Sequence, residues 1–187
     1  MFAKFPEEGK VKTRLAKDIG DKEAVAIYKR LLRILIPEHE NRSYKYYIAV
    51  APTDKVRKFK KIYPAATMIK QQGDDLGEKI THALQRLLNE HKKVILIGSD
   101  CPEVTHQTID EARAALDEND VVIGPAADGG YYLIGMKKYH NLFNEIDWST
   151  EEVLQQTMQK AEDLNVKLLD EKRDIDTADD AKYYHFL

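Results

Sequence analysis

A single carboxylate, that of Asp100, directly follows an apolar run and is the residue best placed to do chemistry. The run covers residues 94–97, is rich in branched aliphatic side chains, and predicts a central strand buried on both faces. Gly98 lets the chain turn, and Pro102 prevents the strand from continuing. In open α/β sheets, ligands bind just beyond the carboxyl ends of such strands. Asp100 is therefore predicted to hold a divalent cation that carries phosphate groups.

A basic loop near the N-terminus carries the side chains that suit phosphate. It follows a short apolar stretch and precedes a predicted helix. Its candidate residues are Lys4, Gly9, Lys12, Thr13 and Arg14. Backbone amides combined with lysine and arginine side chains suit a polyphosphate, although the spacing matches neither a Walker A loop nor a Rossmann glycine fingerprint. A solvated basic turn is the alternative, but the predicted location at the sheet end near the first carboxylate favours phosphate binding.

Two acids near the C-terminus, Asp174 and Asp176, are candidates for a second metal ligand. Alternation along an extended segment places both side chains on the same side. One of them is expected to join Asp100 on the metal, and the pattern leaves open which one. The acids that follow, Asp179 and Asp180, are explained by the N-terminus of a helix, but that explanation does not extend to Asp174 or Asp176.

Two glycine-containing segments are candidate substrate contacts. Asp75 and Gly77 stand at the start of a predicted helix, where a capping role explains Asp75 at least as well as a ligand contact. Asp128, Gly129 and Gly130 form a tight turn. A plain hairpin accounts for the two glycines, but the small residues before them leave room for a bulky ligand and favour a substrate pocket.

Hydrophobic periodicity predicts the elements that must position these residues. Helices are expected over residues 21–35, 54–62, 76–88, 108–116 and 149–164, with a short one after Thr177. Strands are expected over residues 44–51, 66–70, 94–98, 121–124, 131–135 and 166–169. Pro37 is expected to end the first of these helices, and Ser149 with Glu152 is expected to form a capping box.

This alternation of strands and helices predicts an α/β fold with a mostly parallel sheet and helices on both faces. The connection at residues 128–130 is too short for a helical crossover, so antiparallel or bent pairing is expected there. No repeat or linker divides the chain, and residues 1–187 are expected to form a single domain.

Composition narrows the functional class. The chain has 187 residues, a formal net charge of -3 and 33% charged residues, which argues against non-specific binding to nucleic acid. No apolar stretch is long enough to span a membrane. The one cysteine, Cys101, fits a reducing cytoplasm and is better explained by packing than by nucleophilic catalysis. The sequence does not indicate an oligomeric state.

Taken together, these segments resemble one family. The matching motifs are Lys12-Thr13-Arg14-Leu15, Gly73-Asp74-Asp75-Leu76-Gly77, Gly98-Ser99-Asp100-Cys101-Pro102, Asp128-Gly129-Gly130-Tyr131 and Asp174-Ile175-Asp176-Thr177. The chain resembles the bacterial DUF2064 family of glycosyltransferase-like proteins, within the nucleotide-diphospho-sugar transferase superfamily. It is also similar to the nucleotidyltransferases that make molybdenum-cofactor dinucleotides and guanylylated phospholactate. The first strand is shorter here than is usual in the family.

The resemblance implies a GT-A-like, Rossmann-type three-layer sandwich and assigns roles to the candidate residues. Lys4, Lys12 and Arg14 would bind phosphate, and Asp128 would contact the acceptor or sugar. Asp100, with either Asp174 or Asp176, would hold Mg²⁺ or Mn²⁺.

The function expected is a metal-dependent transferase that uses a nucleotide-activated donor, with Asp100, Lys12 and Arg14 as its catalytic residues. Two chemistries fit: glycosyl transfer from a nucleotide-diphospho-sugar, which the resemblance favours slightly, and nucleotidyl transfer from a triphosphate with release of pyrophosphate. The acceptor is an unidentified small molecule. A non-catalytic nucleotide-binding protein is the alternative from a different class.

Overall fold

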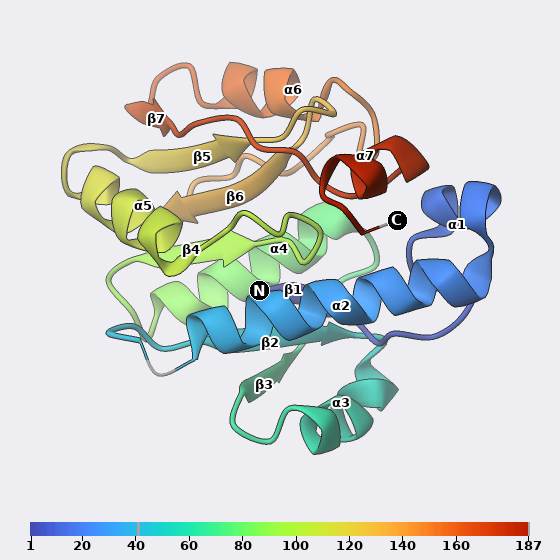
Figure 1. Cartoon of the computed structure of the whole chain (residues 1–187). Helices are drawn as coiled ribbons and strands as arrows, with labels where there is room; N and C mark the ends of the chain where they lie inside the picture. The colour runs from blue at the N-terminus through green and yellow to red at the C-terminus, as the bar shows by residue number, and fades with distance from the viewer. Residues whose placement is uncertain (41, 187) are drawn as a thin grey trace. The chain divides into compact units, whose positions relative to one another are not determined.

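The computed structural model describes residues 1–40 and 42–186 of the chain, and Figure 1 shows its elements. The strands are β1 (Phe2–Lys4), β2 (Tyr47–Ala51), β3 (Thr67–Lys70), β4 (Val94–Ile97), β5 (Val121–Pro125), β6 (Tyr131–Met136) and β7 (Val166–Leu168). The α-helices are α1 (Thr13–Ile19), α2 (Asp21–His39), α3 (Val56–Ile62), α4 (Leu76–Leu88), α5 (His106–Glu118), α6 (Val153–Lys160) and α7 (Ala178–Tyr183), with a 3-10 turn, η1 (Thr53–Lys55). The α/β class predicted from the sequence is confirmed.

Two compact units divide these elements. The first takes in Met1–Lys70, Gly98–His106 and the C-terminal residues from Arg173 onward. The second takes in Gln71–Ile97 and Gln107–Lys172. Each unit contains one sheet. No helix among the described residues is both long and apolar enough to cross a membrane.

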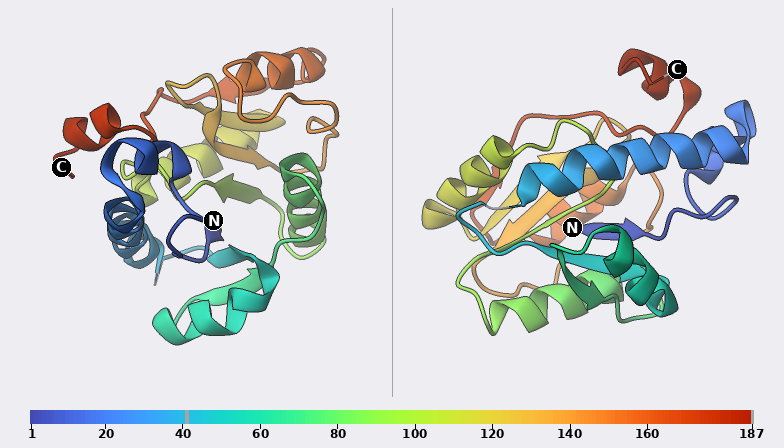
Figure 2. Two further views of the ribbon diagram at one scale, coloured as in Figure 1. Left: turned by 90° about the vertical axis from the view of Figure 1, so that its right-hand side faces the viewer. Right: turned by 60° about the horizontal axis from the view of Figure 1, so that its bottom comes forward.

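The first unit is built on a parallel sheet in the order β1-β2-β3, with Ala3 opposite Val50 and Ala49 opposite Ile69. Residues 48–50 are apolar and fully or almost fully buried, as expected for the central strand of such a sheet. Helix α2 buries an apolar stripe at helical spacing, and α3 packs on β2 and β3. Helix α7 lies beside α1, although most of the chain separates them (Figures 1 and 2).

The second unit contains a mixed sheet in the order β4-β6-β5-β7. Strand β4 stands at one end of this order and its two middle residues are half-buried, so the prediction of a central strand buried on both faces is wrong for residues 94–97. Strand β6 pairs antiparallel with both β4 and β5, and β5 pairs parallel with β7. The antiparallel pairing predicted at the short 128–130 connection is therefore confirmed, with a register shift between Gly124 and Pro125. Helix α4 packs on β4.

Two of the predicted helices have different bounds in the structure. Helix α2 continues through Pro37 to His39. Pro37 lies in the last turn of the helix, where few backbone hydrogen bonds follow it, so its missing N–H does not end the helix at that residue. Helix α6 begins at Val153 instead of Ser149 and ends at Lys160. Ser149 has a left-handed backbone (φ 68) that is incompatible with the predicted cap. The capping box of Thr177 with Asp180 is present and opens α7.

Candidate functional site

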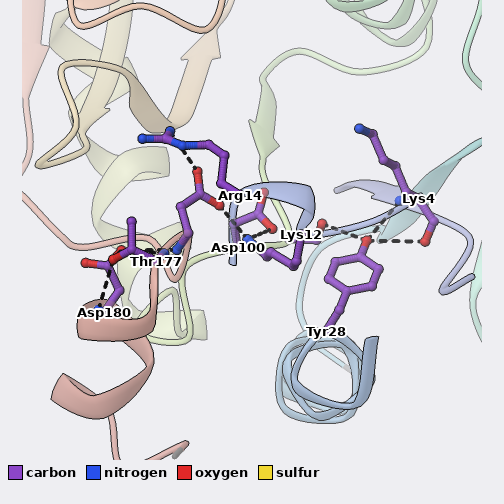
Figure 3. A network of polar contacts seen from close by, with 9 residues as sticks. Lys4, Lys12, Arg14, Tyr28, Asp100, Thr177 and Asp180 are labelled. Atoms are coloured by element: carbon purple, nitrogen blue, oxygen red, sulfur yellow. Dashed lines mark hydrogen bonds and ion pairs between the residues drawn. The ribbon is translucent and has the colours of Figure 1, made fainter. Parts of the chain in front are cut away.

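The centre of the candidate site is the ammonium of Lys12, which lies between two carboxylates of the first unit (Figure 3). Lys12 Nζ contacts Asp100 Oδ1 and lies 2.9 Å from Asp176 Oδ1. The Lys12 side chain is only 3% exposed, whereas those of Asp100 and Asp176 are 41% and 33% exposed. The lysine is therefore buried beneath carboxylates that still reach solvent.

Three separate stretches of chain bring these side chains together. Lys12 immediately precedes α1, Asp100 follows β4 by three residues, and Asp176 lies two residues before α7. The last two stretches are joined directly, because the Ile175 amide donates to the Asp100 carbonyl at 3.0 Å. Asp180 Oδ2 accepts hydrogen bonds from the Asp176 and Thr177 amides, at 3.2 and 2.9 Å. The helix cap of α7 thus also fixes the backbone that carries Asp176.

The other cations of the basic loop are more exposed. Arg14 Nη1 lies 3.6 Å from Asp176 Oδ2, and its side chain is 64% exposed. The two oxygens of Asp176 therefore face different cations, Lys12 and Arg14. Lys4 is exposed at the end of β1 (Figure 3), and its charge contributes to lowering the pKa of Asp176. Of the remaining loop residues, Gly9 lies in a turn with positive φ (68) and Thr13 opens α1.

The charges of this cluster stabilise one another. Burial alone lowers the pKa of the Lys12 ammonium, but the charges of Asp100 and Asp176 and the hydrogen bonds to them outweigh burial, and the net shift is upward. Burial likewise raises the pKa of Asp176, but Lys12 and Arg14 reverse this effect and hold that pKa below its usual value. At neutral pH the cluster contains a charged lysine and a charged Asp176 carboxylate.

Tyr28 supports the site through hydrogen bonds that the sequence pattern does not predict. Its hydroxyl lies 2.9 Å from the Lys4 amide, 3.2 Å from the Lys4 carbonyl and 3.0 Å from Ser99 Oγ. Tyr28 therefore ties the end of β1 to the residue that precedes Asp100. Burial raises the pKa of Tyr28, and the charge of Asp100 raises it further. The available signal was a tyrosine within the apolar stripe of α2, since the hydroxyl of a buried tyrosine usually has a partner.

The geometry distinguishes between the two late acids. Asp176 forms ion pairs with both Lys12 and Arg14. Lys12 also forms an ion pair with Asp100. Asp174 lies two residues earlier in the same stretch. This arrangement favours Asp176 as the partner of Asp100.

The predicted substrate residues of the glycine segments all lie in the second unit, and each has a local structural role. Asp75 caps α4 by accepting from the Glu78 amide at 2.8 Å, and Asp128 Oδ1 accepts from the Gly130 amide at 3.0 Å. A side chain at Gly77 would place its Cβ 2.5 Å from the Phe143 carbonyl oxygen.

A side chain at Gly129, where φ is 86, would collide with the backbone of Glu151. At both Gly77 and Gly129, the atoms that approach the glycine closely belong to the protein's own chain. Their contact with substrate stays a prediction.

Lys12, Arg14, Asp100 and Asp176 form what we call the Lys12 cluster. The carboxylate oxygens of this cluster are donors that fit a hard divalent cation. Among residues 1–40 and 42–186, no group of three or more histidine, cysteine, aspartate or glutamate side chains could hold a metal ion. Asp100 and Asp176 nevertheless share one cation, the Lys12 ammonium. Mg²⁺ is commonly bound by one or two carboxylates together with substrate phosphates.

Comparison with known proteins identifies the family and the fold of the chain. Residues 38–150 match the family described as uncharacterized protein conserved in bacteria, DUF2064, which confirms the family resemblance predicted from the motifs. A Desulfovibrio desulfuricans structure, provisionally described as a nucleotide-diphospho-sugar transferase, is 36% identical, with a TM-score of 0.89 over 94% of this chain and 80% of that one. No curated protein matches the chain.

Two more distant structures share the fold. The molybdopterin-guanine dinucleotide biosynthesis protein A of Archaeoglobus fulgidus has 15% identity and a TM-score of 0.54, over 82% of each chain. The manganese complex of Rv0371c from Mycobacterium tuberculosis has 14% identity and a TM-score of 0.55, over 82% of this chain and 84% of that one. The similarity to these proteins confirms the predicted fold of nucleotide-diphospho-sugar transferases and nucleotidyltransferases.

Proposed function

The chain belongs to the DUF2064 family, and from that premise we propose that it is a metal-dependent transferase acting on a nucleotide-activated donor. The observation that carries the proposal is the Lys12 cluster, in which two solvent-reaching carboxylates share one cation and Arg14 lies alongside. Such a set can bind a divalent cation and the phosphate groups that accompany it. The manganese complex of the mycobacterial relative supports the metal, and the dinucleotide-synthesis relative supports the nucleotide.

In this proposal Asp100 and Asp176 hold Mg²⁺ or Mn²⁺. When bound, the metal neutralises charge that builds up on the donor phosphate in the transition state. Lys12 and Arg14 direct fixed positive charge toward the same phosphate oxygens, with Lys4 at the rim of the site. Asp180, through the cap of α7, holds Asp176 in position, and Tyr28 holds the segment that leads to Asp100. No protein nucleophile is required.

We favour glycosyl transfer from a nucleotide-diphospho-sugar to a small acceptor, because the 36% identical relative carries that description. Nucleotidyl transfer is the second candidate, because the cationic loop suits a triphosphate equally well and the dinucleotide-synthesis relative shares the fold. In either case the whole chain is proposed to act as one domain, in the cytoplasm where such donors are made. The predicted contacts of Asp75, Gly77, Asp128, Gly129 and Gly130 with donor or acceptor belong to this proposal.

The test is a screen of nucleotides and nucleotide-sugars with Mn²⁺ by thermal shift, followed by analysis of the product released from each stabilising donor. A nucleoside diphosphate supports glycosyl transfer, and pyrophosphate supports the nucleotidyl alternative. If none of the nucleotides and nucleotide-sugars stabilises the protein in the presence of Mn²⁺, the proposal that it acts on a nucleotide-activated donor is wrong.

Variants connect the activity to the site. Asp100→Asn is expected to lower kcat by about 100-fold, because it removes one charge from the transition-state environment. Asp117→Asn is the matched control, since Asp117 forms an exposed surface pair with Lys93 in the second unit. The control should retain the activity of the unmodified protein. Equal activity in both variants would refute the site assignment.

A further inference from the structure

The Lys12 ammonium occupies the position between the two carboxylates of the candidate site. Its Nζ contacts the Oδ1 atoms of Asp100 and Asp176. A metal ion that uses the same two oxygens needs the position that the ammonium occupies. We propose that Lys12 and the divalent cation exclude one another from this position, so that the cation binds together with phosphate and not ahead of it. This inference rests on the function proposed above.

The balance of charge supports exclusion. Two carboxylates balance the charge of one divalent cation, but they do not balance a divalent cation and an ammonium together at hydrogen-bond distance. Like charges that close in a partly buried site repel strongly. Arg14 differs, because its exposed guanidinium approaches only the outer oxygen of Asp176, at 3.6 Å, and solvent screens it.

The burial of Lys12 explains why phosphate is needed for the exchange. A side chain that is 3% exposed cannot leave its ammonium without a partner at low cost. If a cation takes the two carboxylates, Lys12 needs another anion within reach of its side chain. A donor phosphate bound by the same cation supplies that anion, because lysine is a common ligand of phosphate. After the exchange, the carboxylates are paired with the divalent cation and the Lys12 ammonium is paired with phosphate.

The two ion pairs hold Lys12 in a strained backbone conformation. Its φ and ψ of 49 and 43 are left-handed, which costs a non-glycine residue free energy, and its side chain makes no capping hydrogen bond to α1. Strain of this kind persists only where the surrounding contacts determine the conformation. Here the contacts that determine it are the two ion pairs, and they keep Lys12 over the metal position until phosphate arrives.

The resulting behaviour is positive coupling between metal and phosphate. Metal alone binds weakly because it must displace Lys12, and phosphate alone binds weakly because Lys12 is already paired. By thermodynamic reciprocity, each ligand strengthens the other by the same factor.

The experiment measures Mn²⁺ binding to the full chain without phosphate, from the electron paramagnetic resonance signal of free Mn²⁺. Lys12→Met keeps most of the side-chain volume and removes the charge, and it is expected to bind Mn²⁺ about tenfold tighter than the unmodified protein. Lys12→Gln serves as a second uncharged variant should Lys12→Met fail to fold. Arg14→Met, the matched control, removes a neighbouring positive charge that does not occupy the position, and its affinity should rise only about twofold.

Three outcomes overturn the inference. Equal gains in the Lys12 and Arg14 variants mean that general charge, and not occupancy, sets the affinity. Tight binding by the unmodified protein with no gain in the Lys12 variants means that metal and lysine coexist, and the proposed function then stands without this inference. If no protein in the series binds Mn²⁺, even with a stabilising nucleotide present, the metal assignment of the proposed function is wrong as well.

Discussion

Removing charge from the two sides of the Lys12 cluster is expected to have unequal effects on stability. Lys12→Met leaves two carboxylates that are 41% and 33% exposed and can be hydrated where they stand. The double variant Asp100→Asn with Asp176→Asn leaves an ammonium on a side chain that is 3% exposed. The buried partner has no access to water, so the loss of its counter-ions is the more costly change.

The magnitudes follow from this asymmetry. Loss of a hydrogen-bonded ion pair whose remaining partners are hydrated should cost about 1 kcal/mol of unfolding free energy. An uncompensated buried charge costs about 3 kcal/mol or more. The triple variant, which adds Lys12→Met to the two asparagines, removes that buried charge and should regain about 2 kcal/mol of the loss.

Urea denaturation at pH 7 measures these differences. The fluorescence of Trp148, the one tryptophan, and far-UV circular dichroism should report coincident transitions if the chain unfolds as a single domain. The reasoning is refuted if the double asparagine variant is no less stable than Lys12→Met, or if the triple variant is no more stable than the double.

Three further predictions address the strained backbone, a buried histidine and the tyrosine brace. Because Lys12 has φ 49, Lys12→Gly should be more stable than Lys12→Ala by about 1 kcal/mol, and equal urea midpoints for the two would contradict the backbone argument. Burial lowers the pKa of His39 to about 4. The imidazole of His39 is therefore protonated near pH 6.5 in the unfolded chain, but it stays neutral at that pH in the folded chain. Unfolding free energy should therefore fall by about 2 kcal/mol between pH 7 and pH 5, and a His39→Gln variant with the same pH dependence would refute this. Tyr28→Phe should lose about 1–2 kcal/mol in thermal unfolding and weaken Mn²⁺–nucleotide binding, whereas unchanged binding would limit Tyr28 to a purely structural role.

The position of Asp100 could be predicted because it depends on local pattern. An apolar run followed by glycine and an acid indicates a strand end whatever the rest of the chain does, and Asp75 was recognisable as a helix cap for the same reason. The cap of α7 by Thr177 and Asp180 is likewise set by neighbours in the sequence. Local patterns therefore fixed where most of the candidate residues stand.

Long-range contacts could not be predicted in the same way. The basic loop predicts that Lys12 binds phosphate, but the pairing of Lys12 with Asp176 depends on how residues 164 positions apart meet. The choice between Asp174 and Asp176 stayed open because strand alternation treats them alike. Tyr28 lies among the buried apolar residues of α2, and hydrophobic periodicity does not show what the hydroxyl of such a side chain contacts. The contacts predicted between Gly77 or Gly129 and a substrate took no account of other parts of the chain, and the structure shows that Phe143 and Glu151 approach these two glycines.

The distance in sequence between Lys12 and Asp176 also has a consequence for synthesis. A ribosome delivers the lysine early and its second carboxylate only after 164 further residues. Closing so long a loop carries an entropic cost that no local contact offsets in advance. Until the stretch that ends in α7 has emerged, the nascent chain holds Lys12 without one of its two partners. The contacts around Lys12 are therefore completed only after the stretch that carries Asp176 has been synthesised and α7 has docked beside α1.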